Sequence, residues 1–245
     1  MKYNGNDIQW VWFDLDDTII DFTSNSKAAL AKLYVEAGLD RWFADAATWT
    51  ERYEGHNHPL WDSLARGEIT TAFLRMERFR RPLADAGCGD DEARRLSVEL
   101  DPMYLDLLAQ ERGLVPGAKE ILRKVREAGV HTGILSNGFK DVQHRKIERA
   151  GLSELIDLTV LSDDIDVQKP DIRLYTYAME RAGITDPSAH LMIGDNPDTD
   201  IAGAINAGWH AILLQPQHPG KAPKPVPAGA ASAATLADAT EMLEM

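Results

Sequence analysis

Cysteine is almost absent from this chain of 245 residues, which carries only Cys88. One thiol cannot form an internal disulfide or a multi-thiolate metal site, so the sequence argues against redox chemistry and structural zinc. Long apolar runs are lacking as well, because no stretch approaches the roughly 18 to 20 consecutive apolar residues that span a bilayer. The start, Met1 to Asp7, lacks the apolar core of a secretory signal. We therefore expect a soluble, cytoplasmic protein with no membrane partner.

Positive charge is also scarce, because 26 lysines and arginines stand against 39 aspartates and glutamates, a formal net charge of -13. This excess of negative charge disfavours non-specific binding to a nucleic acid polymer or to an anionic membrane surface. A phosphate-bearing ligand would therefore have to be held by local chemistry. With 44% hydrophobic residues, the chain can bury one substantial core and still carry a smaller accessory domain.

The segment from about residue 22 to residue 108 lacks a convincing strand. Apolar residues recur there at helical spacing with charges between them, which is typical of amphipathic helices. Gly38 is well placed to end the first of these helices. The expected helices cover residues 24–37, 44–66, 70–86 and 91–108. The pattern predicts a helical subdomain inserted into the rest of the chain.

Strands and helices alternate outside this insertion. Ile8 to Phe13 is rich in β-branched and aromatic residues, as expected of a strand buried on both faces. Further strands are expected at 130–135, 158–161, 190–193 and 210–214, with helices at 118–128, 141–150 and 172–182 and another before Gly208. A loop or linker is expected at Pro216 to Ala231, before a short terminal helix near 236–243. This alternation predicts an α/β fold with a parallel sheet covered on both faces.

Polar side chains follow four of the predicted strands, and parallel sheets bind ligands at the carboxyl ends of their strands. These residues are Asp14 and Asp16 after the first strand, Ser136 and Asn137 after the second, Lys169 in the loop after the third, and Asp195 after the fourth. We expect them to converge on one crevice. Residues i and i+2 of an extended chain point the same way, so Asp14 and Asp16 can face one substrate. Such a pair of carboxylates can supply a nucleophile and a general acid or base, which suits phosphoryl transfer.

Charge decides whether this transfer is feasible. A carboxylate repels an approaching phosphate dianion by about 4 kcal/mol for each pair of unit charges at ~4 Å, with an effective dielectric near 20. An all-oxygen site made by Asp14 and Asp195 suits Mg²⁺, and Lys169 supplies a second positive charge. The candidate hydrogen-bond donors to the phosphoryl oxygens are Ser136 and the backbone N–H groups of Asn137 and Gly138.

These residues give the chain a resemblance to the haloacid dehalogenase superfamily. Its four sequence motifs resemble, in order, Asp14–Thr18 (DLDDT), the Ser136 turn in ILSNGF, Lys169 in VQKP, and Gly194–Asp200 (GDNPDTD). The resemblance spans nearly the whole chain and implies a Rossmann-like core with a helical cap inserted after the first motif. The implied boundaries are residues 1–21 and 109–245 for the core and 22–108 for the cap. Asp17 departs from the commonest form of the first motif, since many relatives have glycine there.

The resemblance also implies a role for each residue of the site. Asp14 would be the nucleophile and Asp16 the general acid/base, with Mg²⁺ as the cofactor. The other implied roles are phosphate binding by Thr18, Ser136, Asn137 and Gly138, charge neutralisation by Lys169, Mg²⁺ ligation by Asp14, Asp16 and Asp195, and support of Lys169 or of a metal-bound water by Asp200. Asp16 favours a phosphatase over a dehalogenase, because the dehalogenases of the superfamily lack this second aspartate.

A narrower resemblance is to bacterial pyrimidine 5'-nucleotidases, which hydrolyse nucleoside monophosphates. It rests on three segments, Asn57–Thr70 (NHPLWDSLARGEIT), Arg78-Phe79 and Ser136–Phe139 (SNGF). It implies a small nucleotide such as uridylate as substrate, with Trp61 and Phe139 as candidates for contacts to the base. The partner is thus a small phosphorylated metabolite, and the protein is expected to be a monomer or a homodimer. A sugar phosphate or phosphoglycolate as substrate, a phosphomutase, and a non-catalytic phosphometabolite-binding module stay open as alternatives.

Overall fold

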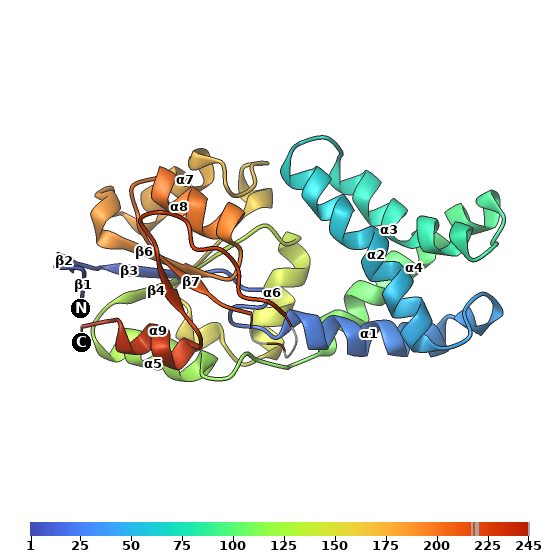
Figure 1. The fold of residues 1–245 in the computed structure, drawn as a ribbon, viewed down its shortest axis with the longest axis horizontal. Coiled ribbons are helices and arrows are strands. Elements are labelled where there is room, and N and C mark those ends of the chain that lie inside the picture. The colour runs from blue at the N-terminus through green and yellow to red at the C-terminus, as the bar shows by residue number, and fades with distance from the viewer. Residues whose placement is uncertain (217, 219–220, 245) are drawn as a thin grey trace. The chain divides into compact units, whose positions relative to one another are not determined.

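The computed structural model describes residues 1–216, 218 and 221–244. The chain forms two compact units, one built from residues 1–23 and 112–245 and the other from residues 24–111. All strands of the described residues belong to the first unit, whereas the second unit is helical (Figure 1). Each unit is built from the local patterns of its own sequence.

A six-stranded, wholly parallel sheet forms the centre of the first unit. In the order β5-β4-β3-β6-β7-β8, its strands are Leu158–Leu161, His131–Ser136, Trp10–Phe13, His190–Gly194, His210–Leu214 and Ala231–Ala233. Strand β3 therefore lies between β4 and β6, and its first residue, Trp10, pairs in register with both His131 and His190. The predicted α/β fold with a parallel, Rossmann-like sheet is confirmed.

Helices cover both faces of this sheet. Their bounds are Ala118–Glu127 (α5), Lys140–Arg149 (α6), Ile172–Ala182 (α7), Ala202–Asn206 (α8) and Leu236–Glu241 (α9). In Figure 1, α5 and α9 lie on one side of the sheet, and α7 and α8 lie on the other. The helices expected in this part of the chain are present, with ends that differ from expectation by a few residues at most. Across the described residues, no helix is both long enough and apolar enough to cross a membrane.

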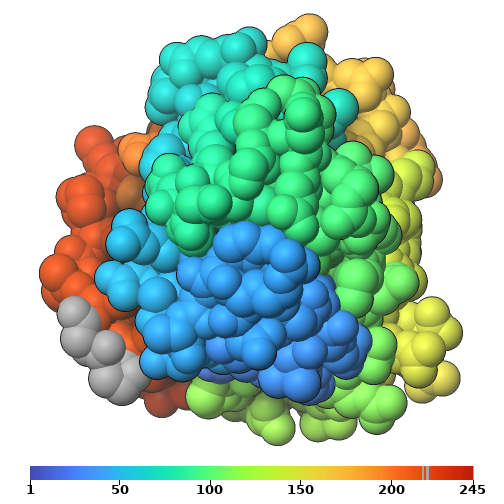
Figure 2. Space-filling model, turned by 90° about the vertical axis from the view of Figure 1, so that its right-hand side faces the viewer, coloured from blue at the N-terminus to red at the C-terminus, as the bar shows by residue number. Residues whose placement is uncertain are grey.

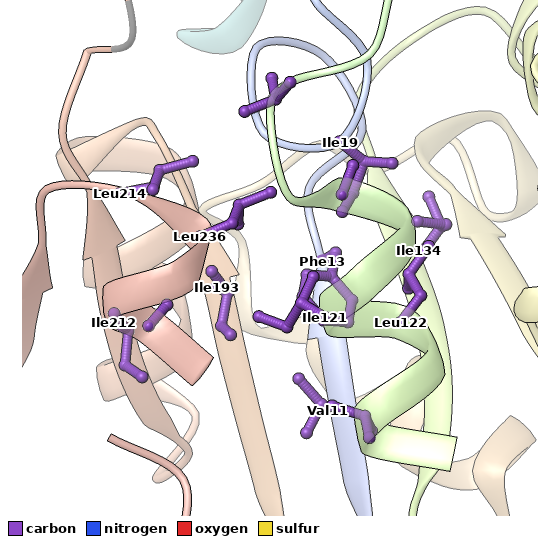
Figure 3. Close-up of a cluster of buried hydrophobic side chains, with 14 of the residues drawn as sticks. Val11, Phe13, Ile19, Ile121, Leu122, Ile134, Ile193, Ile212, Leu214 and Leu236 are labelled. Atoms are coloured by element: carbon purple, nitrogen blue, oxygen red, sulfur yellow. The ribbon is translucent and has the colours of Figure 1, made fainter. Parts of the chain in front are cut away.

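The central strand β3 sends alternate side chains into two buried layers. Val11 and Phe13 point to the side of α5, where Ile121 belongs to the same cluster (Figure 3). Trp12 belongs to the opposite cluster and stacks on Trp209, with 5.7 Å between the ring centroids. Because successive side chains of a strand point to opposite faces, a strand covered on both sides needs an unbroken apolar run. The sequence WVWF meets this requirement.

A short hairpin at the start of the chain was not expected from the sequence. It joins β1 (Lys2–Tyr3) to β2 (Asn6–Asp7) in antiparallel register. The two turn residues, Asn4 and Gly5, have φ angles of 50° and 78°. A two-residue hairpin turn needs positive φ at both central positions, and Asn-Gly is the pair that adopts them most readily. The dipeptide was therefore a usable signal, although each strand has only two residues.

Strand β8 also differs from expectation, because the sequence predicts a loop or linker at residues 216–231. Ala231 pairs with Ile212 of β7, and Ala233 pairs with Leu214. Alanine and serine have little preference for strands, so backbone pairing with β7 creates this strand without a side-chain pattern that marks it. Residues 217, 219 and 220 of the expected loop lie outside the described part of the chain.

The second unit consists mainly of helices that agree with the amphipathic segments of the sequence. Their bounds are Phe22–Glu36 (α1, which starts at the end of the first unit), Ala46–Ala65 (α2), Thr71–Asp85 (α3) and Asp90–Gln110 (α4). Asp45 caps α2 by accepting from the Thr48 N–H at 2.7 Å, and Thr70 caps α3 by accepting from the Phe73 N–H at 3.2 Å. Figure 2 shows this unit, blue to green, in space-filling form.

Aromatic rings fill the interior of this helical unit. Tyr53 of α2 lies 5.1 Å from Phe79 of α3 and 5.5 Å from Tyr104 of α4, measured between ring centroids. Arg78 lies above the Tyr104 ring at 5.3 Å and donates to the carboxylate of Asp101. Aromatic packing and a buried ion pair therefore join α2, α3 and α4.

Gly133 of β4 is a position where the packing leaves no room for a side chain. An added Cβ would lie 2.3 Å from the ring of Trp12, so Gly133→Ala should lower the free energy of unfolding by about 1–3 kcal/mol. Gly55→Ala in α2 is the control, because its Cβ would meet nothing within 4 Å. Alanine is favoured over glycine in a helix by up to about 1 kcal/mol, so the control should be neutral or stabilised. Chemical denaturation measures both changes, and a Gly133→Ala variant as stable as wild type would contradict the close packing.

Candidate active site

Three neighbouring strands bring predicted site residues to one edge of the sheet. Asp14 directly follows β3, Ser136 is the last residue of β4, and Asp195 directly follows β6. Because β4 and β6 flank β3 and all three strands are parallel, these residues lie at the same edge. The Asp14 N–H continues the strand pairing by donating to the Ile193 carbonyl at 3.0 Å.

A buried lysine joins the groups at this edge. Lys169 Nζ donates to Asp14 Oδ1 at 2.6 Å, to Asp200 Oδ1 at 2.7 Å and to the Leu135 carbonyl at 2.7 Å. The Lys169 side chain is only 2% exposed, and a charge buried this deeply is stable only when it is paired. The Asn137 side chain holds the Lys169 backbone, accepting from its N–H at 2.8 Å and donating to its carbonyl at 3.0 Å. The predicted residues Lys169, Asp14 and Asp200 are thus in direct contact.

Carboxylates outnumber ammonium groups in this cluster. Burial raises the pKa of Asp14 well above its usual value, although Lys169 opposes this shift. Burial and the charge of Asp200 also raise the pKa of Asp195 to about 6, with Lys224 acting in the opposite direction. Burial alone would lower the pKa of Lys169, but contact with Asp14 and Asp200 outweighs this effect and raises it. The lysine therefore stays protonated. Burial and the neighbouring carboxylates disfavour the charged forms of Asp14 and Asp195, and a cation bound between them would favour those forms.

Three carboxylates of the cluster are placed to hold a metal ion. Asp14, Asp195 and Asp200 each offer one oxygen, and these oxygens lie within 4.8 Å of one another. An anionic, all-oxygen donor set of this kind fits Mg²⁺. Asp16, the other candidate ligand from the sequence, is not part of this group. Its carboxylate accepts hydrogen bonds from the side chains of Gln143 and Lys146.

Ser136 and Gly138 form a tight turn at the end of β4. Ser136 Oγ accepts from the Gly138 N–H at 3.2 Å and from Gln143 Nε2 at 2.8 Å. Because Ser136 Oγ is the acceptor in both bonds, its own O–H is left to donate to another group. The side chain of Asn137 is engaged with Lys169, so only its backbone N–H can serve the phosphate-binding role that the sequence suggests.

The turn after Asp16 explains the departure at position 17. Asp17 has a φ of 59°, a left-handed conformation that favours glycine and that aspartate tolerates better than most residues. Its carboxylate accepts from the Thr23 N–H at 2.8 Å and from Thr23 Oγ1 at 2.7 Å. Thr18 is buried beside it, and among the described residues its hydroxyl has no hydrogen-bond partner. That hydroxyl is therefore not committed to another part of the protein.

Three side chains that contact the site were not found from the sequence. Gln143 and Lys146 of α6 bind Asp16, and Lys224 Nζ donates to both the carboxylate and the carbonyl of Asp195 at 2.7 Å. The sequence gives a weak indication of the two α6 residues. Gln143 and Lys146 are three positions apart, on the helix face where Val142 and Ile147 predict burial. Lys224 lies in a proline-rich segment and carries no such signal.

This chain is similar to known proteins over most of its length. The family model of haloacid dehalogenase-like hydrolases matches residues 8–208, so the chain belongs to this family. It is 34% identical over 217 residues to the pyrimidine 5'-nucleotidase YjjG of Escherichia coli. This alignment covers 85% of this chain and 87% of that protein. It is 29% identical over 236 residues to a phosphoserine phosphatase of Thermus thermophilus, with 86% and 91% covered. The predicted family is confirmed, and so is the predicted enzyme class, a phosphatase.

A solved structure shares the fold over nearly the whole chain. The HAD-hydrolase YfnB of Bacillus subtilis, bound to magnesium, matches with a TM-score of 0.83 and 23% identity, covering 98% of this chain and 100% of that one. At this identity, the match shows the common fold alone.

A divalent cation should stabilise the protein measurably if it binds the carboxylate cluster. With NaCl used to hold ionic strength constant, MgCl₂ is expected to raise the Tm, because it binds the native site and not the unfolded chain. A ligand at 100 times its Kd adds about 2.7 kcal/mol. Asp195→Asn should lose most of this rise, whereas Asp91→Asn, an exposed site in α4, should keep it. Equal rises in wild type and Asp195→Asn would contradict a metal site that includes Asp195.

Proposed function

We propose that this enzyme hydrolyses phosphate monoesters of small metabolites through an aspartyl-phosphate on Asp14, with Mg²⁺ as its cofactor. We further propose pyrimidine nucleoside 5'-monophosphates as its preferred substrates. The observation that carries the mechanism is the contact of buried Lys169 with both Asp14 and Asp200. A carboxylate held by an ammonium group, at the ligand-binding edge of a parallel sheet, is suited to attack an anionic phosphoryl group.

Asp14 carries out the first step in this proposal. Its Oδ1 accepts from Lys169, which holds the carboxylate while Oδ2 attacks phosphorus. The new O–P bond forms the aspartyl-phosphate, and the bond from phosphorus to the alcohol oxygen breaks. The Lys169 ammonium lowers the repulsion between the carboxylate and the phosphate dianion. When bound, Mg²⁺ neutralises further charge and polarises the phosphoryl oxygens.

The proposed metal ligands are the carboxylates of Asp14 and Asp195. Asp16 is a further candidate ligand from the sequence, and its carboxylate accepts from Gln143 and Lys146. Asp200 supports the site by holding Lys169.

Asp16 moves the protons of the reaction in this proposal. In the first step it donates a proton to the alcohol oxygen as the bond to phosphorus breaks. In the second step it accepts a proton from the water that attacks phosphorus, which releases inorganic phosphate and restores the Asp14 carboxylate. The two half-reactions thus return Asp16 to its starting state.

The phosphoryl oxygens would be bound by groups at the ends of β3 and β4. The proposed donors are the hydroxyls of Thr18 and Ser136 and the backbone N–H groups of Asn137 and Gly138. The hydroxyl protons of Thr18 and Ser136 are compatible with this role, because neither hydroxyl donates to a partner among the described residues. Such donors stabilise the charge that develops on the phosphoryl group.

The division of labour between parts of the chain is also a proposal. Residues 1–21 and 109–245 would carry the chemistry, and residues 22–108 would act as a cap that contacts the rest of the substrate. Of the two aromatic candidates for contacts to a base, Phe139 is buried and Trp61 is half-buried. Trp61 therefore has more ring surface to offer. The preference for pyrimidine nucleotides rests on the similarity to the Escherichia coli nucleotidase.

A panel of substrates tests the proposal. In the presence of Mg²⁺, we expect kcat/KM for uridine 5'-monophosphate to exceed that for phosphoserine, a sugar phosphate and phosphoglycolate by about tenfold or more. Phosphoserine is the most informative competing substrate, because the chain is also similar to the phosphoserine phosphatase of Thermus thermophilus. Asp14→Asn should lose at least about 10³-fold on every substrate, since it removes the nucleophile. A higher kcat/KM for phosphoserine would reject the nucleotide preference, and full activity of Asp14→Asn would reject the mechanism.

A further inference from the structure

Two polar side chains are buried on one face of α6. Gln143 is 1% exposed and Lys146 is 3% exposed, and residues three apart lie on the same side of a helix. They share this face with the apolar Val142 and Ile147, which are also buried. Lysine and glutamine rarely occupy such positions unless their polar atoms are paired.

Both side chains are paired with the carboxylate of Asp16. Lys146 Nζ donates to Asp16 Oδ1, and Gln143 Nε2 donates to Asp16 Oδ2 at 3.0 Å. Lys146 Nζ also donates to Gln143 Oε1 at 2.7 Å, and Gln143 Nε2 also donates to Ser136 Oγ at 2.8 Å. Each carboxylate oxygen of Asp16 therefore has its own donor. The two donors are linked to each other, and through Gln143 to the end of β4.

The surroundings are shaped to admit these two side chains. An added Cβ at Gly138 would lie 2.1 Å from Gln143 Nε2, so the glycine leaves the space that the amide occupies. The Lys146 ammonium lies 5.1 Å from the centre of the Phe22 ring, which favours a cation at that position.

The geometry leaves Asp16 able to act on a substrate. A carboxylate has about four lone-pair positions on its two oxygens, and the two α6 side chains use one on each oxygen. One position on each oxygen is left for a proton or a substrate group. Linked hydrogen bonds inside a protein hold a side chain in one orientation more firmly than a single contact does.

We propose that Gln143 and Lys146 are positioning residues for the acid/base step, holding the Asp16 carboxylate in line with the oxygen of the leaving alcohol. This inference rests on the proposed function, in which Asp16 protonates that oxygen. Gln143 further ties the orientation of Asp16 to Ser136, which belongs to the proposed phosphate-binding turn. Loss of either side chain should therefore harm the protonation of the leaving group more than the attack by Asp14.

The dependence on the leaving group separates this role from a structural one. A nucleoside 5'-phosphate releases a poorly acidic alcohol, which needs a proton as it leaves, whereas p-nitrophenyl phosphate releases a stable phenolate, which does not. In Lys146→Met, kcat/KM for the alkyl phosphate that wild type hydrolyses fastest should fall by roughly 10²-fold, in the range of general acid catalysis. For p-nitrophenyl phosphate it should fall by less than about tenfold. Asp16→Asn should show the same pattern more strongly.

Lys124→Met is the matched control, because it makes the same substitution on the exposed face of α5 and should change neither substrate. Gln143→Leu tests the same ratio with the ammonium left in place, and it serves if Lys146→Met does not fold by circular dichroism. Equal losses on both substrates, or no loss, in the folded variants would overturn the positioning role. A wild-type enzyme that hydrolyses neither substrate would instead overturn the proposed function, and this inference would fall with it.

Discussion

The structure of the site depends above all on the pairing of the Lys169 ammonium. From the loop after β5, this group donates to Asp14, to Asp200 and to the carbonyl of Leu135, and so joins three strand ends. Because a buried charge is stable only with close partners, the loop must hold Lys169 next to the ends of these strands. The Asn137 side chain keeps it there through two hydrogen bonds to the Lys169 backbone. Lys169 and Lys224 face the three carboxylates of Asp14, Asp195 and Asp200, and in our proposal Mg²⁺ supplies further positive charge.

Asp200 lies against the last residue of β6, in the turn that follows this strand. An added Cβ at Gly194 would lie 2.4 Å from Asp200 Oδ2, so glycine is required where that carboxylate folds back on the strand end. The Asn196 N–H donates to Asp200 Oδ2 at 2.9 Å, and the Tyr175 hydroxyl donates to the Asp200 carbonyl at 3.1 Å. Tyr175 belongs to the buried apolar cluster on one face of the sheet. The packing of this cluster therefore helps to determine the position of Asp200, a charged residue of the site.

Much of this arrangement could be predicted because local patterns determine it. Strands β5 and β7 have the bounds expected from the sequence, 158–161 and 210–214, and the placement of Asp14 and Asp195 at one edge follows from parallel topology. Strand β8 could not be predicted, since three small residues form it only by pairing with β7. Gln143 and Lys146 were missed because polar residues of an amphipathic helix are normally assigned to solvent, and only the tertiary structure shows the carboxylate they meet. Lys224 contacts Asp195 although the two residues are 29 positions apart in the sequence. Lys224 lies in a proline-rich segment, where no helix or strand periodicity indicates which way its side chain points.

In the proposed mechanism, Asp14 becomes covalently phosphorylated during turnover. The most direct measurement is rapid acid quench of the enzyme with a phosphate-labelled substrate, followed by peptide mapping and treatment with hydroxylamine, which cleaves acyl phosphates. We expect transient label on the peptide that contains Asp14, and we expect hydroxylamine treatment to remove it. Turnover with no labelled protein at any quench time, or label on a peptide without Asp14, would contradict it.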